Sequence, residues 1–187
     1  MKASRLFVVD ADVLRASGKG ERPPAPECLQ TLNTILRVCH RVAISPAIQK
    51  QWKEHASQAA RRWWRQMLVR KKVVPVADAE VERCIAPDGA AAGLQRSIDR
   101  HFGEGDERTE VLGDVLLVTA ALAAQAAILS NDRKARRRFR TVARTCRALR
   151  TVEWSIPPEA ADDVVPWLER GAPVEPRRQL GCDEPER

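Results

Sequence analysis

Aspartate residues stand at three places where the chain changes between apolar and polar character. Asp10 follows the apolar residues 6–9, Asp132 follows residues 127–130, and Asp114 begins a long apolar stretch. Such carboxylates are costly to leave without a partner, because they repel one another and lose hydration. A divalent cation between them removes that cost, and Mg²⁺ and Mn²⁺ prefer hard oxygen ligands. We therefore predict a Mg²⁺ or Mn²⁺ site with Asp10, Asp114 and Asp132 as catalytic metal ligands.

Each acid also has a structural explanation that the sequence leaves open. Asp10 could cap the turn after a strand, and Asp12 could either bind the metal through water or cap the same turn. Asp114 and Asp132 both stand where a helix N-cap is expected, a role compatible with metal binding. Two polar residues beside Asp132 are predicted to line the site by orienting ligands or phosphate: Ser130 and Asn131.

The elements that must position these acids follow an alternating pattern of strands and helices. Strands are predicted over residues 6–9, 42–45 and 127–130, with a weak strand or extended connection at 73–76. Helices are predicted over residues 28–38, from Pro46 onward with Ser45 as N-cap, and over 57–69, 94–101, 114–125 and 133–140. This order predicts an α/β protein with a Rossmann-like three-layer fold, in which helices flank a mostly parallel sheet.

Charge divides the chain into two parts. Residues 155–187 carry eight acidic side chains against four arginines and hold six of the twelve prolines, which leaves a net charge of +11 on residues 1–154. We predict one domain over residues 1–154, followed by an acidic, proline-rich tail with a short helix around residues 162–170. A body this basic suits a polyanion, although arginines that merely solvate helices would give the same composition.

Basic residues gather in two clusters. One follows Asp132 directly, and the other is interleaved with Trp63 and Trp64. Arginines beside aromatic rings can hold phosphates and stack bases. Alternatively the tryptophans belong to the core, as we expect for Trp52 and one of the Trp63–Trp64 pair. The residues predicted to bind RNA are Arg61, Arg62, Arg65, Arg133, Lys134, Arg136 and Arg137.

Other classes of protein are disfavoured by composition. Five cysteines without a CxxC pair or suitably spaced histidines predict free thiols and no zinc site. The longest apolar run, residues 115–129, is broken by Thr119 and Gln125 and is shorter than the roughly 20 residues of a membrane helix. The apolar stretch near the N-terminus is too short for a signal peptide. We therefore expect a cytoplasmic protein with no membrane partner.

Three segments resemble a known family. Residues 8–14, with the sequence Val-Val-Asp-Ala-Asp-Val-Leu, resemble the opening of PIN-domain (PilT N-terminus-like) ribonucleases. Residues 114–122 and 128–132 resemble the later part, where an acid opens a helix, the helix leads into a strand, and a further acid ends that strand. The resemblance covers about residues 5–140 and implies a PIN-like nuclease domain that cleaves single-stranded RNA with Mg²⁺ or Mn²⁺. It also implies a toxin-like role with an antitoxin partner, and a homodimer.

The chain departs from this family on the helix after the second strand. The family usually has a glutamate there, and the aligned residue is Gln51, which carries no charge but is predicted to line the site. Glu54 follows one turn later on nearly the same face and is the candidate catalytic substitute, unless it is a solvent-facing helix residue. If neither residue serves, the alternative is a catalytically weakened PIN fold that acts as an RNA-binding module.

A further alternative is a phosphatase. Residues 9–14 also resemble the DxDxV/T opening of haloacid dehalogenase-like phosphatases, which would make Asp10 a nucleophile and Asp12 a general acid. Asp114 echoes a later acidic motif of that family. That motif usually follows a strand and has a second acid soon after, whereas residues 115–118 are apolar.

Overall fold

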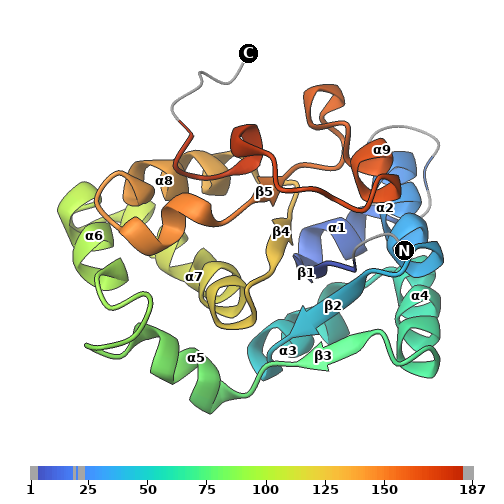
Figure 1. Cartoon of the computed structure of the whole chain (residues 1–187), viewed down its shortest axis with the longest axis horizontal. Helices are drawn as coiled ribbons and strands as arrows, with labels where there is room; N and C mark the ends of the chain where they lie inside the picture. The colour runs from blue at the N-terminus through green and yellow to red at the C-terminus, as the bar shows by residue number, and fades with distance from the viewer. Residues whose placement is uncertain (1–3, 19, 21–23, 183–187) are drawn as a thin grey trace.

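A computed structural model of the protein describes residues 4–18, 20 and 24–182. Its centre is a five-stranded sheet with the order β3-β2-β1-β4-β5, in which every strand is parallel to its neighbours (Figure 1). The strands are β1 (Leu6–Val9), β2 (Arg41–Ile44), β3 (Val73–Pro75), β4 (Ala127–Leu129) and β5 (Trp154–Ser155). The predicted α/β class, with helices flanking a parallel sheet, is confirmed.

The strand order reverses direction at β1. The chain runs outward from β1 to β3 and then returns to the other side of β1 to add β4 and β5. Phe7 of β1 therefore lies opposite Val42 of β2 on one side and Ala127 of β4 on the other. In parallel sheets, ligands bind beyond the carboxyl ends of the strands at such a reversal. The end of β1 and the end of β4 are thus the expected place for a site.

The helices form two groups on either side of the sheet. One group packs together in the crossovers from β1 to β3, and comprises α1 (Ala11–Ala16), α2 (Ala25–Arg37), α3 (Pro46–His55) and α4 (Gln58–Val69). The other lies in the crossovers from β3 to β5, and comprises α5 (Asp78–Ile85), α6 (Leu94–His101), α7 (Asp106–Ala124) and α8 (Arg133–Ala143). Since such crossovers are right-handed, the two groups cover opposite faces.

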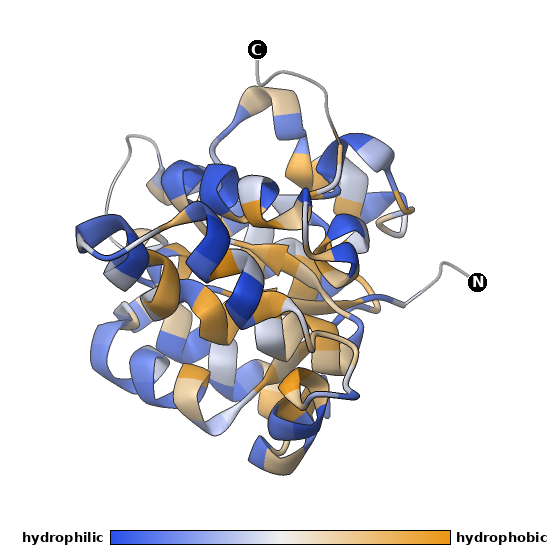
Figure 2. Cartoon of the chain, turned by 90° about the vertical axis from the view of Figure 1, so that its left-hand side faces the viewer, coloured by the Kyte–Doolittle hydropathy of each residue, from blue (hydrophilic) through white to orange (hydrophobic). Residues whose placement is uncertain are grey.

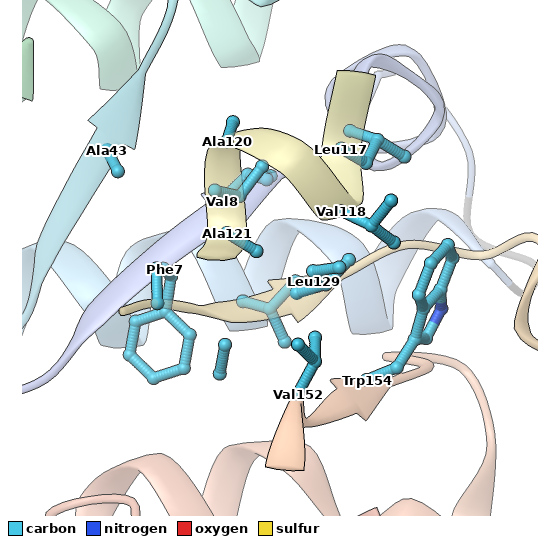
Figure 3. Close-up of a cluster of buried hydrophobic side chains, with 14 of the residues drawn as sticks. Phe7, Val8, Ala43, Leu117, Val118, Ala120, Ala121, Leu129, Val152 and Trp154 are labelled. Carbon is cyan, nitrogen blue, oxygen red and sulfur yellow. The ribbon is translucent and has the colours of Figure 1, made fainter. Parts of the chain in front are cut away.

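The core lies between these layers and the strands. Figure 3 shows Ala120 and Ala121 of α7 beside Val8 of β1, and small side chains there allow the helix to approach the sheet closely. Phe7 points to the opposite face, where its ring meets Trp167 edge-on at a centroid distance of 5.7 Å. Figure 2 shows apolar residues along the strands and the inner faces of the helices, and hydrophilic residues outside.

Two helices differ from the sequence prediction. Helix α5 was not predicted, because Cys84 is its one buried residue and its apolar pattern is short. Helix α7 begins at Asp106, about two turns before the predicted start at Asp114. Asp106 and Glu107 occupy its first turn, where acidic side chains stabilise a helix N-terminus. The prediction that Asp114 opens this helix is therefore wrong, and Asp114 lies in its interior.

Residues 155–182 pack against the body of the protein. They begin within β5 and include α9 (Val164–Glu169), which packs on α2, and the short 3₁₀ helices η2 (Ala160–Asp162) and η3 (Pro176–Arg178). A further 3₁₀ helix, η1 (Arg147–Thr151), precedes β5. Trp167 and Arg178 are completely buried. In the part of the chain that is described, no helix has the length and apolar character needed to span a membrane.

Candidate active site

The ends of β1 and β4 are joined by two hydrogen bonds to carboxylates. Asp10, the residue after β1, accepts a hydrogen bond at Oδ2 from the Ser130 hydroxyl, at 2.7 Å. Asp12, in the first turn of α1, accepts one at Oδ2 from the backbone N–H of Asn131, at 2.9 Å. Ser130 and Asn131 directly follow β4. Residues some 120 positions apart in the sequence thus meet beyond the carboxyl ends of β1 and β4.

Asp132 and Asp114 interact with these two acids through their charges. Asp132 is the N-cap of α8 and accepts a hydrogen bond at Oδ1 from the backbone N–H of Ala135, at 2.8 Å. Asp114 is half-buried on α7, and its pKa is raised to about 6 by burial, then by the negative charges of Asp132 and Asp10. We call Asp10, Asp12, Asp114 and Asp132 the acidic cluster.

Burial and mutual repulsion oppose ionisation of the acids in the cluster. Burial and then the charge of Asp10 raise the pKa of Asp12 to about 8. Burial also raises the pKa of Asp10, although the Ser130 hydrogen bond opposes the shift. Among the described residues, no hydrogen-bond donor reaches Asp12 Oδ1, which is buried. These are the electrostatic properties of carboxylates that lack a counter-charge.

The acidic cluster offers carboxyl oxygens to a divalent cation. In residues 4–18, 20 and 24–182, no group of three or more His, Cys, Asp or Glu side chains is arranged to hold a metal ion. One oxygen each of Asp10, Asp12 and Asp132 is instead occupied by a hydrogen bond within the protein. The donor chemistry suits a hard cation, because carboxyl oxygens are hard ligands and Asp12 Oδ1 is unpartnered. With a pKa of about 8, Asp12 would release its proton when it binds the ion at pH 7. Convergence on one ion requires side-chain rotation.

The helix that follows β2 places Gln51 and Glu54 differently. Helix α3 buries Ile48 and Trp52, and Gln51 is half-buried beside them. Glu54 is turned about 200° around the helix from Trp52, its side chain is 53% exposed, and its carboxylate lies 3.9 Å from His55 Nε2. Glu54 therefore lies on the solvent side of α3, whereas Asp12 supplies a fourth carboxylate within the acidic cluster.

The basic residues of α8 divide between the surface and the interior. Lys134 and Arg137 are exposed, and Arg133 is exposed but pairs with Glu159. Arg136 is only 4% exposed, and its Nη1 lies 3.1 Å from Asp162 Oδ2. Arg136 was predicted to bind RNA, but it is not available on the surface. The helical period turns its side chain inward, toward Asp162 of the C-terminal segment.

The basic residues of α4 are all exposed, and its tryptophans are not equivalent. Arg61, Arg62 and Arg65 lie on the outer surface. Trp63 is buried and donates a hydrogen bond to the carbonyl of Leu32, whereas Trp64 is half-buried. One tryptophan of the pair therefore belongs to the core and the other reaches the surface.

Sequence reasoning missed a residue beside the site. Cys28, on the apolar face of α2, lies 3.3 Å from the side-chain nitrogen of Asn131, whose backbone N–H binds Asp12. Burial raises the pKa of this thiol to about 11, so it stays neutral at pH 7. Its helical spacing indicates a core position and contains no signal of the contact with Asn131.

Comparison with solved structures finds a likeness in fold. No family model and no curated protein matches the chain. A chain in the crystal structure of VapBC2 from Rickettsia felis, bound to a DNA fragment from their promoter, is similar over 81% of this chain and 98% of that chain. The sequence identity is 9% and the TM-score is 0.46, so the likeness carries no weight for the site or the activity.

Proposed function

We propose that the protein is a metal-dependent endoribonuclease that cleaves single-stranded RNA at the acidic cluster. The observation that carries the proposal is that Ser130 and Asn131, directly after β4, donate hydrogen bonds to the carboxylates of Asp10 and Asp12 at the strand-order reversal. Burial and then the charges of Asp132 and Asp10 raise the pKa of Asp114 to about 6. The resemblance of residues 8–14, 114–122 and 128–132 to PIN-domain nucleases supports the same activity. Mg²⁺ or Mn²⁺ held by the cluster would lower the pKa of a bound water and stabilise charge on a phosphodiester.

The residues around the cluster have distinct roles in this proposal. The Ser130 hydroxyl and the backbone N–H of Asn131 orient Asp10 and Asp12. Gln51 can offer an oxygen but no charge, so the cluster depends on its own four aspartates. The exposed cations that attract the phosphates of the RNA are Arg61, Arg62, Arg65, Arg133, Lys134 and Arg137. An antitoxin partner, a homodimer and a cytoplasmic location remain predictions from the sequence.

The test is cleavage of end-labelled single-stranded RNA with Mg²⁺ or Mn²⁺, with and without EDTA. We expect cleavage only with the metal. Asp114→Asn should reduce the cleavage rate by about 100-fold or more, because loss of a metal ligand removes several kcal/mol of transition-state stabilisation. Asp106→Asn is the matched control, since Asp106 is an exposed residue in the first turn of the same helix. Its rate should stay close to that of the wild type.

Other outcomes identify the alternatives. RNA binding without cleavage in either metal would point to the binding module. Hydrolysis of phosphate monoesters alone would support the phosphatase with Asp10 as nucleophile. The interior position of Asp114 in α7 weighs against the phosphatase, because the acidic motif of that family usually follows a strand.

A further inference from the structure

A pocket lies between α1, α3 and α4, outside the acidic cluster. Its volume is ≈ 270 Å³, and its aromatic walls are Trp52 and Trp64, whose rings meet edge-to-face with a centroid distance of 5.1 Å. Leu14 of α1 adds an apolar side chain to this wall. The pocket is large enough for one planar aromatic group but is small compared with the sites of drug-sized ligands.

The two tryptophans differ in how firmly they are held. Trp52 is 4% exposed and its Nε1 donates a hydrogen bond to the carbonyl of Val9, at 2.9 Å. Trp64 is half-buried. Its ring meets Trp52 edge-to-face and also borders the pocket. Trp52 is thus a fixed wall tied to β1, and Trp64 offers ring surface for stacking.

The polar groups of the pocket complement a nucleotide. Gln49 is half-buried and provides an amide with both donors and an acceptor. Lys53 and Arg61 are exposed side chains at the pocket, and Arg61 Nε is held by the carbonyl of Ala56 at 3.1 Å. An aromatic wall, one amide and two cations match the base and the phosphate of single-stranded nucleic acid.

The pocket lies close to the acidic cluster along the chain. Val9, which accepts the Trp52 hydrogen bond, directly precedes Asp10. Leu14, which borders the pocket, lies in α1, and Asp10 is the N-cap of that helix. A base held in the pocket would therefore belong to a nucleotide near the one whose phosphate meets the acids.

We propose that this pocket binds one unstacked nucleobase of the RNA substrate. Trp64 stacks on the base, Gln49 bonds to its edge, and Lys53 and Arg61 hold the neighbouring phosphate. The inference rests on the proposed function and deepens it. Because the base must leave any duplex to enter, the pocket selects single-stranded substrates.

The test compares an intact single-stranded RNA oligonucleotide with one of equal length that lacks its bases. Both are titrated against the full-length protein in EDTA, so that binding is measured without cleavage. The wild type should bind the intact oligonucleotide more tightly. Trp64→Leu should weaken that binding about 5- to 150-fold, the range measured for loss of one stacked base. Trp64→Phe, which keeps an aromatic face, should retain most of the preference.

A matched pair on α4 separates the pocket from general electrostatics. Arg61 lines the pocket and Arg62 does not, although both are exposed arginines in adjacent positions. Arg61→Ala should weaken binding of the intact oligonucleotide more than binding of the base-free one, whereas Arg62→Ala should weaken binding of both equally. Thermal unfolding of each variant verifies that it is folded.

The results distinguish failure of the pocket from failure of the nuclease. Equal binding of both oligonucleotides by the wild type would overturn the inference, even if the protein cleaves RNA. If Arg61→Ala, like Arg62→Ala, weakened binding of the intact and the base-free oligonucleotide equally, the inference would be overturned as well. A base preference that Trp64→Leu abolishes would uphold the pocket, even if no metal supports cleavage.

Discussion

At the scale of single residues, Asp12 shows how the site opposes the stability of the fold. Its carboxylate is buried near Asp10, and its pKa is raised from 3.8 to about 8. The folded protein therefore holds the Asp12 proton more tightly than the unfolded chain does. The contribution of Asp12 to the free energy of unfolding is complete below its pKa in the unfolded chain, and it is lost as the pH rises through its pKa in the folded protein.

We predict that Asp12→Asn flattens this pH dependence. In EDTA, the free energy of unfolding of the wild type should fall between about pH 4 and pH 8, because the folded state releases a proton that it binds preferentially. The introduced amide would keep an acceptor for the Asn131 N–H without a charge. The variant should be about 1–3 kcal/mol more stable than the wild type at pH 8. Urea titrations at several pH values measure the difference.

The control for this prediction is Asp88→Asn, which changes an exposed aspartate in the loop after α5. Its pH profile should follow that of the wild type. Adding Mn²⁺ should stabilise the wild type more than Asp12→Asn, because the ion would supply the missing counter-charge. Identical pH profiles for the wild type and Asp12→Asn would contradict the prediction.

At the scale of elements, Lys72 holds the end of α2 against the start of β3. Its ammonium donates to the carbonyls of Leu36 at 2.8 Å and Ile35 at 3.3 Å, and also to that of Val38. These carbonyls lie at the C-terminal end of α2, where the helix leaves its last acceptors unpaired. A cation there also interacts favourably with the helix dipole.

We predict that Lys72→Met lowers the free energy of unfolding by about 1–2 kcal/mol. Methionine keeps an apolar stem of similar length but loses the donors, so the last carbonyls of α2 lose their bonds to the ammonium, and Leu36 keeps the bond from Arg70 Nη1 at 3.2 Å. Lys71→Met is the matched control, because Lys71 is the adjacent exposed lysine. Urea unfolding measures both variants. Equal stability of the two would show that the ammonium contributes nothing to the end of α2.

At the scale of the whole molecule, the C-terminal segment completes the interior. Arg178 is fully buried, donates to the Ser155 hydroxyl at 2.9 Å, and lies 4.3 Å from the centre of the Trp167 ring. Asp162 accepts from the backbone N–H of Ile156 at 2.6 Å and pairs with Arg136. Acids of this segment therefore neutralise basic residues of the body, and its apolar residues cover one face of the sheet.

We predict that Trp167→Ala destabilises the protein by about 3–5 kcal/mol, the usual cost of removing a fully buried aromatic side chain. The cavity would lie beside Phe7 in the middle strand of the sheet. Val174→Ala, in the same segment but with Val174 64% exposed, should change stability little. Guanidinium unfolding followed by circular dichroism measures both. A small loss in Trp167→Ala would mean that the segment contributes little to the core.

The sequence by itself determined the elements whose signals are local. Ser45 was predicted as an N-cap and accepts a hydrogen bond from the Ile48 N–H, and helix α6 spans the predicted residues 94–101. Strands β1 and β4 were predicted from short apolar runs, which bury in a parallel sheet. Caps and apolar periods depend on residues a few positions apart, so they can be read along the chain.

Only the tertiary structure decided which of these residues meet. The contact of Ser130 with Asp10, the inward turn of Arg136 to Asp162, and the pocket beside Trp64 each join segments that are separate in the sequence. The early start of α7 also escaped prediction, since residues 106–113 have the charged composition of a turn. These features depend on strand order and packing across the sheet, and a local pattern of residue types does not encode such long-range pairings.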